Sequence, residues 1–469
     1  MYKYPSKQVS VTDFEMPMGM SLDQENRWVK KSRMIPWEAI EHRYAKLFES
    51  GKGNPAKPLR MALGALLIQK ERGISDVEVA LQIQETPCLQ YFCGLPGYVN
   101  ELPFDASSMV HFRKRLTENI FGEINEMVIA GAQKPEKPVA GDDDNEPPNS
   151  GTLIVDATCA PQNIRYPQDT SLLNEAREKL EAMVDKLHKP GEEKPRTYRQ
   201  KARKDYLNFA KGRKKTGKQI RKAQGQQLRY IRRDMEIVEE YLRAGRELPR
   251  AWAERLETIK TLYEQQLSMF QNRTHRVDDR IVSLHQPWVR PIVRGKAKAK
   301  CEFGAKLDIS VADGFVRLEH TSFDAYNESE NLIPIIKRYH ERTGRYPHRV
   351  LADGIYRNRE NINWCNEKGI RLMGKPLGRP PKNFVLNRKL CRADAVDRIQ
   401  VERKFSYAKG SFGLGLIRTR LKETSLSAIA LSVLALNIAH LARLSFVLFR
   451  LLILRSCCFY PRRGLVIVQ

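Results

Sequence analysis

Thr152-Leu153-Ile154-Val155-Asp156 is a short apolar run that ends in a carboxylate, and it decides the fold of this chain. Arg349-Val350-Leu351-Ala352-Asp353 repeats the pattern much later in the sequence. Apolar runs of about four to eight residues are typical of buried strands. The two runs therefore predict two strands, each of which delivers an aspartate at its end.

A third carboxylate, Glu402, lies in a stretch of helical character at 398–409. Arg398 precedes it by four residues and Lys409 follows it by seven, so at roughly 100° per residue all three share one stripe of a helix. Phe405 lies beside that stripe and could pack inward. An exposed Arg398–Glu402 ion pair, worth about 0.3–0.5 kcal/mol, is the alternative interpretation. The two strand-end aspartates favour a metal site instead.

Composition selects a class of partner. The 469 residues carry a formal charge of +26, with 41% apolar and 29% charged residues, which indicates a globular chain of two to four domains. Such a charge attracts polyanions, most often nucleic acid, although ribosomal, histone-like and membrane-surface proteins share it. Eight cysteines include no CxxC pair, which is typical of reduced thiols in the cytoplasm.

The first part of the chain, 1–133, reads as an all-helical domain. Ser75-Asp76-Val77-Glu78 has the form of a helix-capping box, and a later helix through 105–116 ends in three successive basic residues. These three are Arg113, Lys114 and Arg115. Short helices of this kind resemble a helix-turn-helix module that binds DNA. The alternative is a helical bundle with a solvated basic face.

A linker rich in Pro, Gly and Asp at 134–151 precedes the first strand, and a helical insertion at 171–278 follows it. Between Arg196 and Arg233 this insertion has fifteen Lys or Arg residues, with Asp205 as the one acid and aromatic residues interleaved. We expect a clamp for the DNA backbone, with Lys214 and Lys215 among its contacts. A solvated charge run is the alternative.

The remaining chain completes a sheet. Asp313-Gly314 between two alternating runs predicts a hairpin. The order of elements is typical of an α/β, RNase H-like fold, a mixed five-stranded sheet flanked by helices, built from 152–170 and 279–455. In that topology the first and fourth strands are neighbours, which would bring Asp156 and Asp353 together. The predicted strands are 152–157, 306–312, 315–319, 348–352 and 370–373, and the predicted helices are 328–343, 358–368, 398–409 and 424–455.

One late segment, 424–442, carries no formal charge and could just span a bilayer. Asn437, His440 and several serines argue for a buried core helix instead, so no membrane is expected. The tail at 456–469 differs in character from that helix. The N-terminus has no apolar stretch of the signal-peptide kind.

Phosphodiester cleavage needs an in-line nucleophile, a stabilised leaving oxygen and a neutralised phosphate. Two magnesium or manganese ions, about 3.5–4 Å apart, meet all three needs. Magnesium prefers oxygen ligands and keeps open positions for water and phosphate, so few carboxylates suffice. Asp156 is the natural bridge between the ions, with Asp353 and Glu402 completing the set.

Several short motifs now add up to a family resemblance. They are Val155-Asp156-Ala157-Thr158, Ile164-Arg165-Tyr166-Pro167-Gln168-Asp169, Arg290-Pro291-Ile292-Val293-Arg294-Gly295-Lys296, Glu302-Phe303-Gly304-Ala305-Lys306, Ala352-Asp353-Gly354-Ile355-Tyr356 and Arg398-x3-Glu402-x6-Lys409. In this order, over roughly 30–450, the chain resembles bacterial insertion-sequence DDE transposases. The resemblance implies that Asp156, Asp353 and Glu402 are the acidic triad. It also implies that Arg398 and Lys409 contact DNA phosphate.

The chain departs from related transposases in two places. Those proteins often carry Tyr three residues before the arginine, where this chain has Ala395. Some of them also place their insertion between the last strand and the glutamate helix, whereas here it follows the first strand. Roles tied to that tyrosine or to that insertion are therefore not carried over.

The resulting expectation is a cut-and-paste transposase of the bacterial cytoplasm, associated with the nucleoid. It would bind double-stranded DNA, both terminal inverted repeats and target, as a homodimer. Two alternatives stay open: an RNase H-like nuclease without strand transfer, and a catalytically idle DNA-binding regulator.

Overall fold

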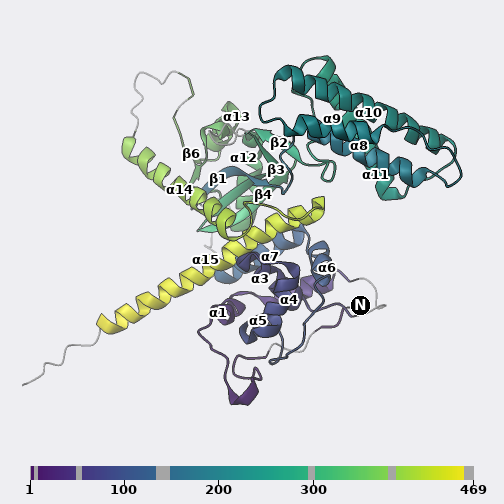
Figure 1. Ribbon diagram of the computed structural model, residues 1–469. Coiled ribbons are helices and arrows are strands. Elements are labelled where there is room, and N and C mark those ends of the chain that lie inside the picture. The colour runs from purple at the N-terminus through teal and green to yellow at the C-terminus, as the bar shows by residue number, and fades with distance from the viewer. Residues whose placement is uncertain are drawn as a thin grey trace, which may run out of the picture.

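The computed structural model describes residues 2–4, 9–48, 55–133, 148–293, 301–375, 377–378 and 387–458, with side chains up to 445. Three parts are visible in Figure 1: a set of N-terminal helices, a sheet flanked by helices, and a separate helical bundle. Most of the predicted linker at 134–151 and of the predicted tail at 456–469 lies outside the described residues.

The N-terminal helices pack around α3. Every residue of α3 from Leu59 to Ile68 is buried, which makes it the central helix of this part. Ser75 caps the next helix by accepting a hydrogen bond from the backbone N–H of Glu78 at 3.1 Å, as its capping pattern predicts. The elements are η1 (Pro17–Gly19), α1 (Arg27–Met34), α2 (Trp37–Ala45), α3 (Leu59–Arg72), α4 (Asp76–Glu85), α5 (Pro87–Phe92), α6 (Ser108–Arg115) and α7 (Glu118–Ala132).

The sheet is mixed, in the order β2-β3-β1-β5-β6, with β4 also paired to β3. β1 is antiparallel to β3 and parallel to β5. Asp313 and Gly314 both have positive φ, so the predicted hairpin turn joins β3 to β4. The strands are β1 (Thr152–Pro161), β2 (Arg290–Val293), β3 (Cys301–Ala312), β4 (Phe315–Ser322), β5 (Arg349–Leu351) and β6 (Arg371–Leu372).

The prediction of five strands is short by one, because β2 at 290–293 also joins the sheet. It pairs with the first residues of β3, on the edge that β4 occupies further along. The strand is only four residues long and contains Pro291, so neither its length nor its composition marks it as a strand in the sequence.

Helices cover both faces of the sheet. Leu153, Val155 and Val350 pack with α12 and α13 on one face. Ile154 points to the other face and shares a core with Val401 of α14 and with α15. Around the sheet lie η2 (Glu328–Asn331), α12 (Leu332–Thr343), η3 (Gly354–Tyr356), α13 (Arg359–Glu367), α14 (Arg388–Ser411) and α15 (Lys422–Cys458).

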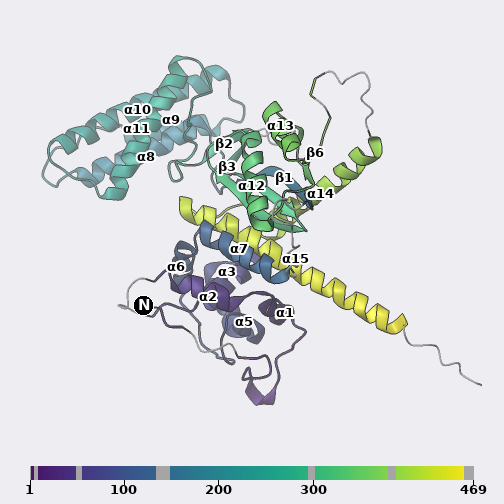
Figure 2. The ribbon, with the colours of Figure 1, turned by 180° about the vertical axis from the view of Figure 1, so that it is seen from behind.

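Helix α15 joins the N-terminal helices to the sheet. Figure 2 shows it running beside α7, between the two parts. The Asn437 side chain accepts a hydrogen bond from the backbone N–H of Val316 at 2.9 Å and donates to Asn125 of α7 at 2.7 Å. Residues 422–445 are long and apolar enough to cross a membrane, but most of their apolar stretch is buried within the protein. The segment 424–442 is thus a core helix, as predicted.

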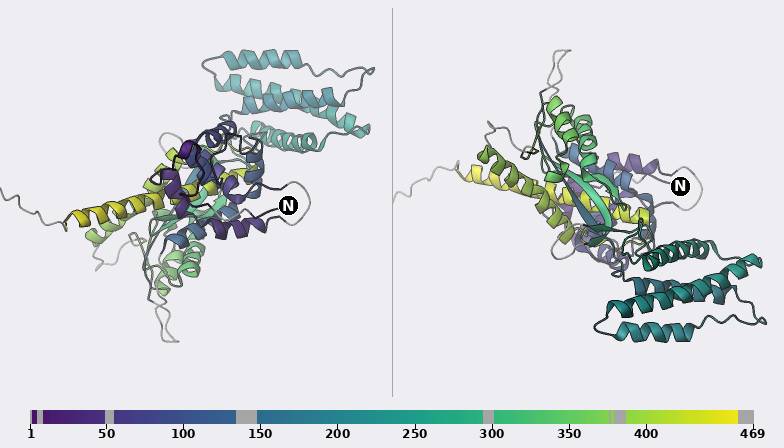
Figure 3. Two further views of the ribbon diagram at one scale, coloured as in Figure 1. Left: turned by 90° about the horizontal axis from the view of Figure 1, so that it is seen from below. Right: turned by 90° about the horizontal axis from the view of Figure 1, so that it is seen from above.

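The insertion is a bundle with a hydrophobic core of its own, drawn mainly from residues within 172–187, 228–241 and 256–262. Its helices lie side by side and stand off from the sheet in Figure 3. The longest begins at a capping box in which Thr216 and Gln219 exchange side-chain and backbone hydrogen bonds. The helices are α8 (Asp169–Leu187), α9 (Arg199–Lys211), α10 (Gly217–Arg243) and α11 (Arg250–Gln271).

Candidate active site

Strand register brings Asp156 and Asp353 together, although the prediction that Asp156 ends its strand is wrong, because pairing with β3 continues β1 to Pro161. In the parallel pair of β1 and β5, Thr152 lies opposite Arg349 and Ile154 opposite Leu351. Continuing this register by two residues places Asp156 opposite Asp353, on neighbouring strands that are about 4.8 Å apart. The negative charge of Asp353 is also felt at Asp156, whose pKa it raises.

Asp156 lies within β1 and is mostly buried, with 18% of its side chain exposed. Its Oδ1 accepts a hydrogen bond from the backbone N–H of Ala157 at 2.8 Å. Asp353 follows β5 directly and is exposed, and its side chain accepts from the backbone N–H of Gly354 at 2.6 Å, which caps η3. Each carboxylate thus keeps oxygen atoms available for a further ligand.

Glu402 reaches the same place from α14. Arg398, one turn earlier on this helix, lies between two carboxylates. Its Nη1 is 3.7 Å from Oδ2 of Asp156, and its Nη2 is 3.4 Å from Oε1 of Glu402. The predicted i,i+4 pair is therefore present, but it also links α14 to the central strand. Phe405 packs against the hydrophobic core, as predicted.

Ion pairs that the sequence did not reveal fix α14 against the sheet. Asp394 is 2% exposed and accepts from Arg349 of β5 at 2.9 Å and from Arg371 of β6 at 2.6 Å. Arg349 also pairs with Asp397 at 2.5 Å and donates to Thr152 at 2.8 Å. Two parallel strands and the N-terminal half of α14 are thus held together, which sets the position of the helix that carries Glu402.

Burial raises the pKa of Asp156 to about 6. The hydrogen bond from Ala157 and the charge of Arg398 act against this rise, while the charges of Asp353 and Glu328 add to it. A carboxylate under this repulsion is stabilised by any cation that reaches it. In the described structure the guanidinium of Arg398 lies 3.7 Å from the Asp156 carboxylate and is placed to stabilise its negative charge.

The fit of a divalent ion can be judged from these oxygens. Among the described residues, no three His, Cys, Asp or Glu side chains are grouped closely enough to hold one ion. Asp156 and Asp353 lie side by side, whereas Glu402 is 56% exposed and joined to them through Arg398. Carboxylate oxygens are the ligands that magnesium prefers. The donor set therefore fits, provided that the long Glu402 and Arg398 side chains rearrange.

Asp308 of β3 is another acid close to β1, and it lies on the opposite face of the sheet from Asp156. It is paired with Ala157 on β1, whereas Asp156 is paired with Ile309. Asp308 is fully buried, and its Oδ2 accepts from Asn331 at 2.5 Å. Strand alternation thus separates it from the group that contains Asp156.

The other predicted contacts to DNA lie elsewhere. Arg113 of α6 is held inside the N-terminal part by Asp76 and Gln69, and Arg115 lies 5.1 Å from the ring centre of Phe48. Lys114 between them is exposed. The three residues were predicted to share one role, but their surroundings leave Lys114 most open to a partner.

Lys214 and Lys215 lie in the exposed turn between α9 and α10, which belong to the helical bundle that stands apart from the sheet in Figure 1. Lys215 also lies 4.7 Å from the ring centre of Phe209. Lys409 is near the end of α14, on the wall of a cavity that it shares with Lys70 and Arg418. Asp156 and Asp353 are thus neighbours and Arg398 links Asp156 to Glu402, while the other predicted basic contacts lie elsewhere.

Comparison with known proteins gives two family matches. Residues 350–439 match a family described as a transposase DDE domain, and residues 18–115 match a transposase domain of the DUF772 type. The first match contains Asp353 and Glu402. These matches support an insertion-sequence DDE transposase. Transposases act on DNA and cleave and join its strands, so the matches support DNA as the partner.

A curated relative from Rhizobium meliloti, an uncharacterized protein called ORF8 in the nfe locus, is 27% identical over 175 residues. The aligned region is 36% of this chain and 77% of the relative. No solved structure matches the chain significantly. DDE transposases generally use divalent metal ions, in keeping with the carboxylates described above. The DDE match begins before Asp353 but after Asp156, so the assignment of Asp156 depends on strand register.

Proposed function

We propose that this protein is a transposase that binds the terminal inverted repeats of an insertion sequence and catalyses both cleavage and strand transfer. An RNase H-like catalytic domain, interrupted by the helical insertion, would perform both steps in the bacterial cytoplasm at the nucleoid. The freed 3′-hydroxyl of the element would attack a phosphodiester of the target DNA, with release of the target's own 3′ oxygen.

The observation that carries the proposal is that Asp156 and Asp353 lie on neighbouring strands while Arg398 links Asp156 to Glu402. The β1–β5 register supports the pairing of Asp156 with Asp353. Arg398 supports the approach of Glu402, because its guanidinium contacts both Asp156 and Glu402. Such a group on the edge of a basic protein is suited to chemistry on a phosphodiester.

Asp156, Asp353 and Glu402 would hold two magnesium or manganese ions, which would activate the attacking oxygen and stabilise the leaving oxygen. Asp156 is the central ligand in this proposal, because it neighbours Asp353 and shares Arg398 with Glu402. Arg398 would turn from the carboxylates toward the phosphate when the ions neutralise them. Lys409, seven residues beyond Glu402, would contact the backbone further along.

Two basic surfaces would bind the duplex. The N-terminal helices would recognise the terminal repeat, with Lys114 exposed beside Arg113 and Arg115. The insertion would clamp the backbone through Lys214, Lys215 and the exposed cations around them. Contacts of this kind add affinity and salt dependence without reading sequence. Pairing of two element ends would require a homodimer.

Cleavage of linear DNA carrying the ends of the element tests the proposal. We expect the purified protein to cut at the ends in magnesium or manganese, and to join a pre-cut 3′-hydroxyl end to a target plasmid. Variants Asp156→Asn, Asp353→Asn and Glu402→Gln should lose both reactions but keep DNA binding. Full activity in all three variants would refute the assignment.

The two alternatives give different results in the same assay. A nuclease without strand transfer would cut the ends but leave the pre-cut 3′-hydroxyl unjoined. A regulator that has lost catalysis would bind the terminal repeats yet cut nothing in either metal. Joined product that disappears in the three variants would exclude both.

A further inference from the structure

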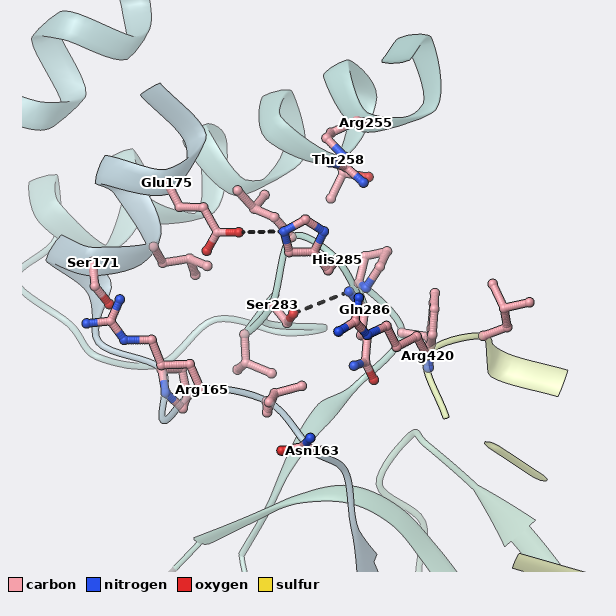
Figure 4. Close-up of a pocket in the computed structure, with 18 of the residues that line it drawn as sticks. Asn163, Arg165, Ser171, Glu175, Arg255, Thr258, Ser283, His285, Gln286 and Arg420 are labelled. Carbon is pink, nitrogen blue, oxygen red and sulfur yellow. Dashed lines mark hydrogen bonds and ion pairs between the residues drawn. The ribbon is translucent and has the colours of Figure 1, made fainter. Parts of the chain in front are cut away.

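A cavity of about 620 Å³ opens between the insertion and the catalytic part. Its walls come from the segment after β1, from α8 and α11, from the segment before β2, and from the connection between α14 and α15. Figure 4 shows this pocket, with side chains from all these segments around it. None of the proposed catalytic residues lines it, so the cavity is separate from the acidic centre.

Three arginines line the cavity without protein partners. Among the described residues, no hydrogen bond or ion pair is made by the guanidinium groups of Arg165, Arg255 and Arg420. The two acids on the wall are already engaged: Glu175 contacts His285 at 3.1 Å, and Glu254 contacts Arg250 at 2.9 Å. The cavity therefore presents positive charge that the protein itself does not neutralise, which suits an anion such as phosphate.

An aromatic ring and a buried amide complete the site. Tyr166, next to Arg165, is 70% exposed, and only its contact with Phe303 at 5.7 Å and 89° fixes the ring. Gln286 is 4% exposed, and its Oε1 has no hydrogen-bond partner among the described residues. A free ring suits a nucleobase, and an unsatisfied buried amide suits a polar ligand.

The volume and position of the cavity restrict the kind of ligand that it can bind. A volume of 620 Å³ is in the usual range for small-molecule pockets, about 300–1,000 Å³, so an unpaired nucleotide fits where a duplex does not. Asn163 on the wall is seven residues beyond Asp156, which is roughly 23 Å along an extended chain. One strand of a duplex, with about 3.4 Å between successive nucleotides, would cover the distance from Asp156 to the cavity wall with about seven nucleotides.

We propose that this cavity binds an unpaired nucleotide of the DNA, with phosphate held by Arg165, Arg255 and Arg420 and the base stacked on Tyr166. The proposal rests on the proposed function, because it takes DNA to be the substrate. It adds a site for single-stranded DNA to an enzyme otherwise expected to bind duplex. It also predicts that the junction between the insertion and the catalytic part holds a DNA end whose two strands have separated.

Fluorescence anisotropy with labelled DNA tests this site in the full-length protein. The probes are a blunt duplex and the same duplex with a short oligothymidine tail at the 3′ or the 5′ end. We expect the wild-type protein to bind one tailed duplex more tightly than the blunt one. Tyr166→Ala should weaken binding of that tailed duplex about tenfold, or about 1.4 kcal/mol, which is in the range for stacking one base.

Matched variants separate stacking from general charge. Tyr166→Phe keeps the ring and should bind like the wild type. The triple variant Arg165→Ala, Arg255→Ala, Arg420→Ala should lose the preference for the tail. Arg243→Ala removes an exposed arginine at the end of α10, outside the cavity, and should keep that preference. Circular dichroism shows whether each variant is folded.

Two results would overturn the inference. The first is a wild-type protein that binds the blunt duplex and both tailed duplexes with equal affinity. The second is a Tyr166→Ala variant whose affinity for blunt and tailed duplexes falls by the same factor. Neither result bears on the acidic triad, because cleavage of the element ends is measured separately. Conversely, a wild-type protein that prefers one tail but does not cleave the element ends would contradict the proposed function and leave this site standing.

Discussion

The acidic centre and the basic insertion use charge in opposite ways. At the proposed acidic centre two aspartates lie on neighbouring strands and Arg398 links one of them to Glu402, and the charges that hold α14 in place are paired and partly buried, as with Asp394 between Arg349 and Arg371. In the insertion many cations are spread over α9 and the start of α10, and most are exposed. The first arrangement depends on position. The second depends on the number of charges. A single substitution should therefore abolish activity at the acidic centre, whereas each substitution in the insertion should weaken DNA binding only by a small step.

The difference between the acidic centre and the basic insertion should be largest at the proposed metal ligands. Asp156→Asn changes one atom and one charge, but it removes the central oxygen ligand of the acidic group. We expect cleavage to fall by on the order of a thousandfold or more, since metal stabilisation of the transition state is worth several kcal/mol. Single-turnover cleavage in magnesium measures this loss.

DNA binding at equilibrium is the control for that prediction. Asp156→Asn should bind duplex as tightly as the wild type or slightly more tightly, because a negative charge is removed from the path of the phosphates. A parallel loss of binding and cleavage would mean that the acidic centre contributes to affinity, and the contrast between the two regions would fail.

The insertion also contains a buried carboxylate, in contrast to its many exposed cations. Asp234 of α10 is fully buried, and neither of its oxygens has a hydrogen-bond partner among the described residues. Burial, and then the charge of Glu181, raises its pKa to about 7, although Arg177, Arg233 and Arg199 act against the rise. The protein thus keeps a proton on Asp234 that the unfolded chain releases near pH 4.

The sign of the pH dependence follows from that raised pKa. Between about pH 4 and pH 7 the folded state binds the extra proton, so stability falls as pH rises through this window. Asp234→Asn should remove the dependence and stabilise the bundle at pH 8 by at most about 4 kcal/mol. Hydrogen exchange of α10 at pH 5 and pH 8 measures it. Equal protection in wild type at both pH values would show that Asp234 is ionised in the folded state.

Local patterns made much of the fold predictable. The apolar runs before Asp156 and Asp353 gave the two parallel strands, and Asp313-Gly314 gave the hairpin between β3 and β4. The apolar helix near Asn437 was also predictable, because 424–442 carries no formal charge and only a few polar residues. These features depend on neighbours in the sequence, which is why the chain reveals them.

Long-range pairings were not predictable. Arg349 and Asp394 are both charged residues in a highly charged chain, and nothing local shows that they form a buried pair. The same holds for the cavity at Arg165, Arg255 and Arg420, which are brought together from three segments. Strand β2 was missed because it is short and its pairing partner, rather than its own composition, makes it a strand.

The pairing of α14 with the sheet gives a prediction of intermediate size. Asp394→Ala leaves Arg371 without its partner and leaves Arg349 with Asp397 alone. Because the arginines are partly exposed, we expect a loss of about 1–3 kcal/mol in the free energy of unfolding. Activity should fall further than stability alone explains, since α14 also carries Glu402.

Glu254→Ala is the matched control for that loss. It removes an acid from an exposed i,i+4 ion pair with Arg250 in the insertion, so the change in stability should be below about 0.5 kcal/mol. Chemical denaturation of both variants, followed at the same tryptophan signal, compares them. If the two substitutions cost the same, the ion pairs around Asp394 do not hold the helix, and position matters no more in the catalytic part than in the insertion.

The smallest effects are expected at single cations of the insertion. Lys214→Ala and Lys215→Ala each remove one exposed charge, so each should weaken duplex binding modestly and equally for all sequences. If each lysine meets one phosphate, the slope of log affinity against log salt should fall by about 0.9 per substitution. Titration of labelled duplex at several salt concentrations measures this slope. Additive reductions in the double variant would fit a surface that works by number of charges, whereas a loss concentrated in one lysine would show that the insertion, like the acidic centre, depends on position.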